Sequence, residues 1–186
     1  PPSEEEAVIA AHLHAMQHAH RMLLILVPTE SSRGSDLADN LTRSGLIVAC
    51  RPREEEPDPA VQVFITDGET ELGLWYRLAP VTYMGGTLAP GARGRSPLEP
   101  AALGSAILHG PLTDPHTAAF ARLTAAGAAR RVDTPAGLAA AVADLISPDK
   151  AALLAHNAWV ASSGGAEVAE TMARVILDSL ARAEAT

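Results

Sequence analysis

The sequence has little cysteine, few aromatic residues and no long apolar run. Cys50 is its only cysteine, so no disulfide can form within the chain, and a reducing intracellular compartment is expected. No unbroken apolar stretch is longer than Met22 to Val27, whereas a membrane-spanning helix needs roughly 20 such residues. The composition therefore indicates a soluble protein, and with only 3% aromatic residues its core must be filled mainly by aliphatic side chains.

Positive charge is also scarce. The chain has 14 Lys and Arg against 22 Asp and Glu, which gives a net charge of −8. A protein that holds a nucleic-acid backbone must neutralise several phosphates with clustered cations, and an anionic lipid surface makes a similar demand. We therefore expect no nucleic-acid partner and no membrane contact by this chain itself.

What the chain does have is enough aliphatic material for one domain. It contains 186 residues, of which 47% are hydrophobic, so it is predicted to form a single domain over residues 1–186. Short aliphatic runs alternate with helical patterns, as in βαβ units that place helices on both faces of a parallel sheet. The predicted fold is α/β, a Rossmann-like doubly wound parallel sheet. Its expected strands are Met22–Val27, Leu46–Cys50, Val61–Ile65, Val81–Met84, Ala106–His109 and Ala129–Val132.

Helices are predicted between and after these strands. The first should begin near Ser3, with Ser3 as N-cap and Glu6 completing a capping box. A doubly wound domain ordinarily opens with a strand, so we expect that the first strand of this domain lies upstream of Pro1. The predicted helices are Ser3–His20, Ser35–Arg43, Glu69–Leu78, Thr117–Ala126, Thr134–Ile146, Asp149–Ser162 and Ala166–Arg182, with another starting at Pro97.

Ligands of such sheets bind beyond the carboxyl ends of the strands, where two loops stand out. The first, Thr66 to Gly73, leaves a strand and opens a helix, so its backbone N–H groups and the helix dipole favour an anion such as phosphate. Its acidic residues equally suit a simple helix cap. Both interpretations stay open from sequence alone.

The second loop runs from Gly85 to Pro100. Paired glycines directly after a strand, Gly85 and Gly86, let a ligand approach the backbone closely, and Glu99 could accept hydrogen bonds from a ribose. Helix capping is again the alternative for Glu99. Gly86 and Gly91 have the outer spacing of a phosphate-binding P-loop, but Ala92 follows where that motif needs Lys, which argues against an NTPase.

Seven histidines raise the question of a metal. Four of them crowd the first predicted helix, where an exposed helical face is favoured over a zinc site because no cysteine or carboxylate completes a ligand set. His109 and His116 follow the fifth predicted strand, where either could meet a ligand or lie in an ordinary loop. We expect no metal and no cofactor. The four helical histidines are His12, His14, His18 and His20.

Several segments together resemble the C-terminal half of Kdo transferases, which transfer 3-deoxy-D-manno-octulosonic acid (Kdo) from CMP-Kdo to a lipid A precursor. The similarity covers nearly the whole chain. It is carried by Thr66-Asp67-Gly68-Glu69-Thr70-Glu71-Leu72-Gly73, by Gly85-Gly86-Thr87-Leu88 and by Pro97-Leu98-Glu99-Pro100-Ala101, followed by Gly110-Pro111.

This resemblance implies a GT-B fold in which the chain holds the donor nucleotide, while an absent N-terminal domain holds the lipid A precursor and supplies the catalytic base. No catalytic residue is then expected in this chain, which alone should be inactive. The whole enzyme would work at the cytoplasmic side of the inner membrane. The donor-binding residues that the resemblance implies are Arg33, Thr70, Glu71, Gly85, Gly86, Thr87, Ser96 and Glu99.

The sequence also departs from the family pattern. Thr29 and Glu30 replace a cationic pair after the first strand, Ser96 replaces an asparagine, and Pro115 falls where an asparagine is expected. Each lost charge-assisted hydrogen bond costs about 1.5–3 kcal/mol, so donor binding could be much weaker. Two alternatives follow, namely a divergent transferase with another nucleotide-sugar donor and a non-catalytic binding module.

Overall fold

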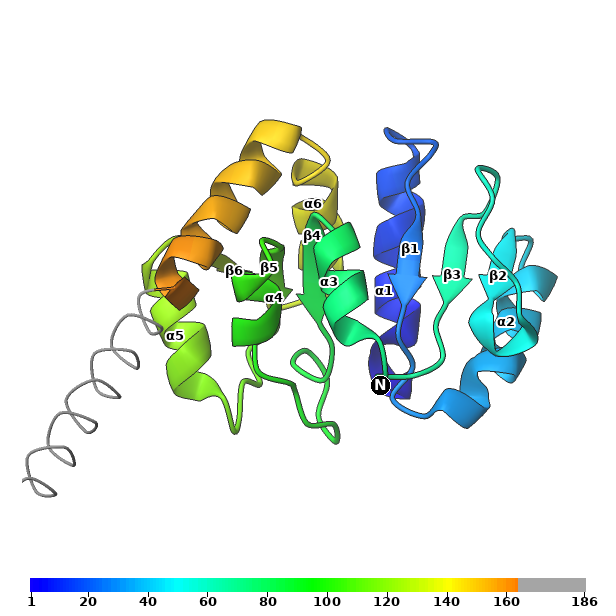
Figure 1. Ribbon diagram of the computed structural model, residues 1–186, viewed down its shortest axis with the longest axis horizontal. Coiled ribbons are helices and arrows are strands. Elements are labelled where there is room, and N and C mark those ends of the chain that lie inside the picture. The colour runs from blue at the N-terminus through cyan, green and yellow to red at the C-terminus, as the bar shows by residue number, and fades with distance from the viewer. Residues whose placement is uncertain (164–186) are drawn as a thin grey trace, which may run out of the picture.

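The computed structural model describes residues 1–163 and shows six short parallel strands alternating with helices (Figure 1). The strands are β1 (Leu24–Leu26), β2 (Val48–Cys50), β3 (Val63–Ile65), β4 (Val81–Met84), β5 (Ala106–His109) and β6 (Ala129–Arg131). The helices are α1 (Pro2–Met16), α2 (Gly34–Arg43), α3 (Leu72–Leu78), α4 (Leu98–Ala102), α5 (Thr117–Ala125) and α6 (Pro135–Asp144), with 3₁₀ turns η1 (Ser31–Arg33) and η2 (Arg51–Arg53). Residues 148–163 are also helical.

The strands form two three-stranded parallel sheets instead of one continuous sheet. Their orders are β1-β3-β2 and β4-β5-β6, and within the described residues β1 and β4 each pair with one strand only. These two edge strands lie nearest the middle of the molecule, with α1 behind the space between them (Figure 1). The central strands β3 and β5 are wholly buried, whereas the residues of β1 are only half-buried.

Alternating side chains along the central strands pack on opposite faces, which confirms the doubly wound arrangement. In β3, Val63 and Ile65 pack with residues of α1 and α2, whereas Phe64 packs edge-on against Trp75 of α3. In β5, Leu108 packs with residues of α1 and α6, whereas Ile107 packs towards α4 and α5. Helix α1 contributes to cores beneath both sheets and so joins them.

The start of α1 corrects one local prediction. The helix begins at Pro2 after Pro1, and no side-chain capping bond is present at its start, so Ser3 and Glu6 do not form the capping box expected of them. Proline is accepted in a first helical turn because its missing N–H has no partner there anyway. The helix also ends at Met16, before the predicted His20.

Other boundaries shift by a few residues. The helix predicted from Glu69 begins at Leu72, and most strands are shorter than the apolar runs that predict them, while β4 and β5 match. The helix predicted over Ala166–Arg182 lies outside the described residues. No helix in residues 1–163 has both the length and the apolar character needed to cross a membrane.

Candidate functional site

The loop after β4 folds around a buried carboxylate that belongs to α1. Oε2 of Glu4 accepts hydrogen bonds from the backbone N of Gly86 and from Oη of Tyr83, both at 2.8 Å. Oε1 accepts from the backbone N of Leu88 and of Ala89, both at 2.7 Å. Glu4 is only 1% exposed, so this contact closes off its carboxylate from solvent.

The same loop is tied to the loop after β5 through Thr87. Its hydroxyl donates to the carbonyl of Met84 at 2.6 Å and accepts from the backbone N of Gly110 at 2.7 Å. Its carbonyl accepts from Leu112 at 2.8 Å. A Cβ on Gly110 would lie 2.1 Å from that carbonyl oxygen, so only glycine fits there.

Two of the residues expected to bind the donor already hold other groups of the chain. The Gly86 amide is already occupied by Glu4, and the buried Thr87 hydroxyl holds two backbone groups, so neither is free to hold a phosphate in this arrangement. Gly86 is needed for another reason: its φ is +81° and a Cβ there would lie 2.9 Å from the Arg93 carbonyl oxygen. Gly85 is half-buried beside them.

The loop after β3 begins with a buried hydrogen bond from the Thr66 hydroxyl to the Gly68 carbonyl at 3.2 Å, and from Asp67 onwards it is held by exposed and half-exposed groups. Thr70 donates its hydroxyl to the Asp67 carbonyl at 3.2 Å, within the turn. Glu71 precedes α3 without capping it through its side chain. Instead its carboxylate forms a two-pronged pair with Arg51, with Nε–Oε2 at 2.9 Å and Nη2–Oε1 at 3.2 Å. The Arg51 guanidinium also lies over Trp75, 5.8 Å from the ring centroid.

The two loops meet at one edge of the molecule. Arg95 of the second loop pairs with Glu69 of the first. A Cβ on Gly73 would lie 4.0 Å from Oε1 of Glu99, so the exposed Glu99 side chain reaches the first turn of α3. Burial raises the pKa of Tyr76, and the nearby carboxylates of Glu99 and Glu69 add to that rise while Arg95 opposes it. The two loops therefore contact each other, and the Glu99 side chain is exposed.

Arg33 and Ser96 are further residues expected at this site. Arg33, in η1 after β1, donates both guanidinium nitrogens to Glu5 of α1, at 2.8 and 3.1 Å, and this pairing raises the pKa of Arg33. Ser96 accepts a weak hydrogen bond from the backbone N of Leu98 at 3.4 Å. Ser96 therefore shapes the start of α4, and Arg33 is held in place by an acid of its own chain.

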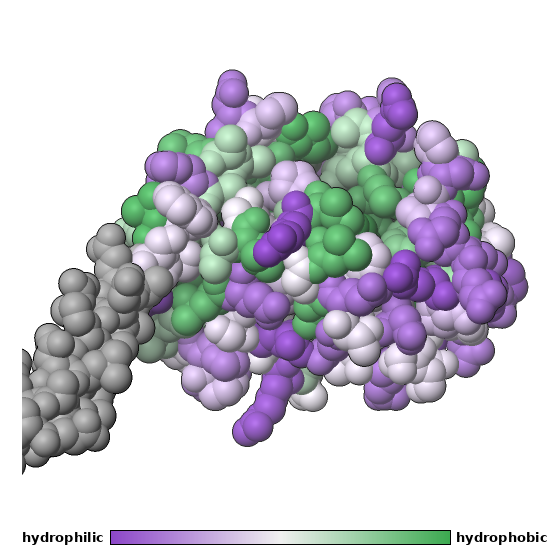
Figure 2. Space-filling model, viewed as in Figure 1, coloured by the Kyte–Doolittle hydropathy of each residue, from purple (hydrophilic) through white to green (hydrophobic). Residues whose placement is uncertain are grey.

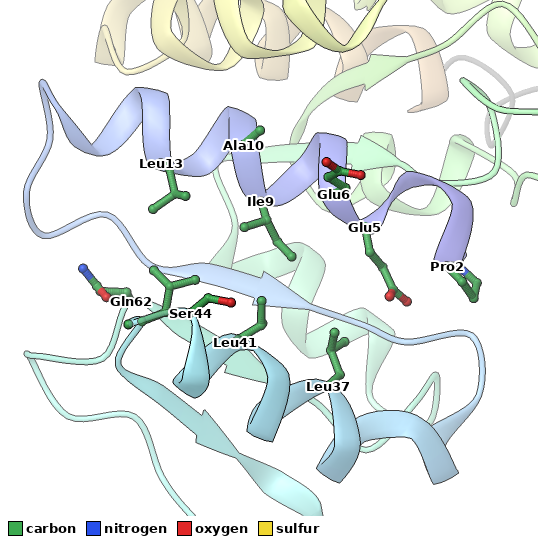
Figure 3. Close-up of a pocket in the computed structure, with 12 residues that line it drawn as sticks. Pro2, Glu5, Glu6, Ile9, Ala10, Leu13, Leu37, Leu41, Ser44 and Gln62 are labelled. Carbon is green, nitrogen blue, oxygen red and sulfur yellow. The ribbon is translucent and has the colours of Figure 1, made fainter.

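An apolar groove lies elsewhere. A groove of about 660 Å³ runs between α1 and α2, where Ile9 and Leu13 of α1 face Leu37 and Leu41 of α2 (Figure 3). It is mainly apolar and holds none of the residues expected to bind the donor. The loop edge is therefore a better candidate than this groove, since only the loop edge combines glycines, cations and carboxylates.

The histidines divide differently from the prediction. His14 and His18 are exposed, but His12 is 2% exposed and neither ring nitrogen has a hydrogen-bond partner in the described part of the chain. It lies on the face of α1 that packs against the sheets, and burial lowers its pKa. No group of three or more metal-ligand side chains comes together within residues 1–163.

His109 is not an exposed loop residue. It ends β5, is 3% exposed, and lies 4.6 Å from the ring of Phe120 between centroids. Its Nδ1 contacts the Gly110 carbonyl at 2.7 Å, and burial lowers its pKa. His109 is therefore a packed core residue, whereas His116 is half-buried at the start of α5.

Sequence reasoning missed four side chains that shape this edge. From sequence alone Glu4 and Glu5 are ordinary first-turn acids, and Arg51 and Tyr83 belong to no motif. The available signal was the helical repeat of α1. Its buried face should include Val8, Ala11 and Ala15, and the same spacing places Glu4 on that face. Their partners could not be read from sequence, because they lie far along the chain.

Comparison with known proteins finds similar sequences and a similar fold. No protein-family model matches the chain. A curated 3-deoxy-D-manno-octulosonic acid transferase of Bordetella pertussis is 32% identical over 171 residues, covering 87% of this chain and 40% of that protein. The crystal structure of the C-terminal CMP-Kdo binding domain of WaaA from Acinetobacter baumannii superposes with a TM-score of 0.71 and 22% identity, covering 82% of this chain and 80% of that one. The chain is similar in sequence to part of a Kdo transferase and in fold to that C-terminal domain.

Other Kdo transferases agree over a shorter region. A probable mitochondrial 3-deoxy-D-manno-octulosonic acid transferase of Arabidopsis thaliana is 31% identical over 108 residues, and the Haemophilus influenzae enzyme is 30% identical over 107. These matches span 24% and 25% of the two relatives, so the chain corresponds to a minor part of each. The fold is thus that of the C-terminal half of a GT-B fold, as the sequence predicted.

Proposed function

We propose that this chain is the donor-binding domain of a glycosyltransferase that moves Kdo from CMP-Kdo to a lipid A precursor. The donor would lie along the edge where the loops after β3 and β4 meet. Glu99 would accept hydrogen bonds from the ribose, and Thr70 and Glu71 would border the nucleotide. Gly85 and Gly86 would allow close approach of the loop, and Thr87 would act through its hold on Gly110.

The observation that carries this proposal is the coincidence of similarity and geometry. The alignment with a Kdo transferase, at 32% identity, covers 87% of the chain. The two loops that resemble the family meet at one edge of the molecule. Exposure of Glu99 beside the first turn of α3 leaves its carboxylate available to a ligand. A carboxylate at this edge of a parallel sheet suits a ribose diol.

The donor phosphate and the Kdo carboxylate need cations, and most arginines of this edge are paired. Arg33, Arg51 and Arg95 each pair with a glutamate. Arg93 is exposed in the second loop and forms no ion pair within residues 1–163, and its own carbonyl packs against Gly86. Arg93 is therefore the first candidate for contacting an anionic group of the donor, with Arg33 released from Glu5 as the second.

The acceptor and the general base would belong to another domain. Such a domain would carry the lipid A precursor and place the enzyme at the inner membrane, in keeping with the family resemblance. We also propose that the unpaired edges of β1 and β4 receive a further parallel strand, the expected first strand of this domain. Support comes from the half-buried residues of β1 and from α1, which runs back from the carboxyl ends of the strands as a helix after such a strand would (Figure 1).

A calorimetric titration of CMP tests the donor proposal. We expect saturable binding to the chain and at least about tenfold weaker binding to Glu99→Ala, the change expected when a hydrogen bond to a charged group is lost. Asp149→Ala removes an exposed acid away from the loops and should bind like the wild type. Equal affinity of the Glu99→Ala variant would remove Glu99 from the site.

One observation favours a second function. Because three arginines of the edge are neutralised by glutamates, the chain could have lost donor binding and serve as a non-catalytic binding module. The altered residues Thr29, Glu30, Ser96 and Pro115 point the same way, or towards another nucleotide-sugar donor. An intact fold with no binding of CMP supports the module, whereas binding of a different nucleotide in preference to CMP supports a changed donor.

A further inference from the structure

The loop from Gly85 to Ala89 is shaped like an anion site that is already filled from within. Successive backbone N–H groups converging on one point form a concave site for an anion, and here three of them converge on Glu4. Each carboxylate oxygen receives two donors, and all the bonds are 2.7–2.8 Å long, in the range of charge-assisted hydrogen bonds. The carboxylate thus stands where a phosphate would stand in an open site.

This carboxylate is held by neutral donors. Within the described residues no Lys, Arg or His lies within ion-pair distance of Glu4. An unpaired charge buried to 1% exposure is costly unless its hydrogen bonds are complete. The loop and the carboxylate therefore depend on each other: removing either leaves buried polar groups without partners.

The neighbouring glutamate has a related contact. Glu5 holds Arg33 in the segment after β1, while Glu4 holds the loop after β4. The first turn of α1 therefore touches both loops that follow the two inner edge strands. Of the two contacts, the one made by Glu4 is buried and the one made by Glu5 is partly exposed.

We propose that Glu4 is an internal anionic ligand of the loop 85–89 and a positioning residue for the donor site. By accepting hydrogen bonds from the three backbone amides of this loop, Glu4 fixes the backbone that continues through Arg93 to Glu99. This proposal rests on the proposed donor binding only in its effect on CMP affinity. That the loop binds the Glu4 carboxylate does not depend on donor binding, and amide exchange and the ionisation of Tyr83 measure it separately.

The decisive experiment is chemical rescue. In Glu4→Ala the amides of Gly86, Leu88 and Ala89 lose their acceptor, so we expect faster hydrogen exchange at these amides and at least about tenfold weaker CMP binding. Added formate or acetate should then restore exchange protection and part of the CMP affinity, whereas chloride at the same ionic strength should not. Glu6→Ala, an exposed acid of the same helix, is the matched control and should bind CMP like the wild type with no response to formate.

Tyr83 supplies a readout that does not need CMP. Burial raises the pKa of its phenol, and the hydrogen bond to Glu4 raises it further. Ultraviolet titration of Glu4→Gln should show this phenol ionising at lower pH than in the wild type, because a neutral carboxamide replaces the charge. Tyr83→Phe identifies which transition belongs to Tyr83, since the chain has only two tyrosines.

The outcomes separate the two proposals. If Glu4→Ala does not fold, the titration and amide exchange of Glu4→Gln replace it. Unchanged Tyr83 ionisation together with unchanged exchange at Leu88 and Ala89 would overturn the internal-ligand proposal. Failure of formate and acetate to restore protection in a folded Glu4→Ala variant would also overturn it. Failure of the wild type to bind CMP, with rescue of exchange intact, would overturn the proposed function and leave the internal ligand standing.

Discussion

The loop after β4 and the loop after β3 meet at one edge of the molecule but are held by different kinds of bonds. The first is fixed by buried hydrogen bonds to Glu4 and Gly110. The second has one buried hydrogen bond at its start, from Thr66 to the Gly68 carbonyl, and beyond it is held by exposed or half-exposed pairs such as Arg51–Glu71 and Arg95–Glu69. Buried polar groups are costly to leave unpaired, whereas surface ion pairs are worth little. The loop after β4 should therefore behave as a rigid wall of the site, and the loop after β3 as its adjustable side.

The surface near α3 also combines two kinds of residue, apolar and strongly polar. In the space-filling view, apolar surface lies close to strongly polar surface near the middle of the face that carries α3 (Figure 2). Leu74 and Leu78 of α3 are 44% and 59% exposed. The adjustable loop thus leads into a helix with exposed apolar residues, while the rigid loop continues through the mostly exposed residues 90–95 into α4, where Pro100 and Ala101 are buried.

The largest effect is expected from Gly110→Ala. The new Cβ would lie 2.1 Å from the Thr87 carbonyl oxygen and 2.6 Å from Cα of Leu88, both in the backbone, so the rigid loop must be displaced. We expect a loss of at least about 3 kcal/mol in the free energy of unfolding. Urea denaturation measures it, with Gly73→Ala as the control.

Gly73 lies in α3 on the adjustable side, and its new Cβ would meet nothing nearer than 4.0 Å. Alanine is favoured over glycine in a helix by roughly 0.5–1 kcal/mol, so this variant should be as stable as the wild type or slightly more so. Equal stability of the two alanine variants would show that the loop after β4 is not rigid.

Thr87→Val should have the next largest effect. Valine keeps the shape of threonine but leaves the buried amide of Gly110 without an acceptor, which costs about 1–3 kcal/mol. Thr87→Ser keeps the hydroxyl and should lose less. Thr70→Val, in the exposed turn after β3, should change stability by under about 0.5 kcal/mol. If thermal unfolding ranks Thr70→Val as the more damaging change, the comparison between the loops fails.

His12 differs from the buried groups of the loop after β4 because its ring nitrogens have no hydrogen-bond partner within residues 1–163. Burial lowers the pKa of His12 in the folded chain, so the unfolded chain binds the proton more readily. The stability tied to neutral His12 is then complete above about pH 6.5 and is lost as the pH falls through that value towards the folded pKa.

His12→Leu should flatten this part of the pH profile of unfolding, measured by urea denaturation at a series of pH values. His109, whose pKa is also lowered, should supply the remaining slope. His14→Leu changes an exposed residue of the same helix and should leave the profile as it was. A profile that His12→Leu does not alter would contradict the assignment.

The smallest effect is expected on the adjustable side. Arg51→Ala removes the pair with Glu71 and the contact with Trp75, yet the paired side chains are about a third exposed, so the loss should stay under about 1 kcal/mol. The difference from the wild type should shrink in high salt, because salt screens exposed charges. A loss as large as that of Thr87→Val, unaffected by salt, would place this loop in the rigid class.

The sequence was a good guide to the parts of the fold that local patterns determine. The bounds of β5 are predicted correctly because a short aliphatic run indicates a buried parallel strand, and those of β4 because Val, Thr and Tyr favour a strand. The division into two sheets could not be predicted, since it depends on which strand edges are paired. The capping box at Ser3 was wrong because Pro2 already begins the helix.

The two loops of the candidate site could be picked out from the sequence, but the bonds that hold them could not. Glycine pairs and acidic residues mark the two loops in the sequence, and the loops do converge. The role of Glu4 was missed because its partners lie 79 to 85 residues away, a separation at which no local pattern operates. His12 was misplaced because the four histidines were assigned together to one exposed helical face, whereas His12 lies on the buried face of α1.

Mapping CMP binding by NMR tests the central claim most directly. The account predicts saturable shifts of backbone amides at residues 70–73 and 91–99, with smaller changes at 85–89 because Glu4 already holds that loop, and none in the groove between α1 and α2. No saturable shift, or shifts confined to that groove, would contradict the claim that the donor lies where the loops after β3 and β4 meet.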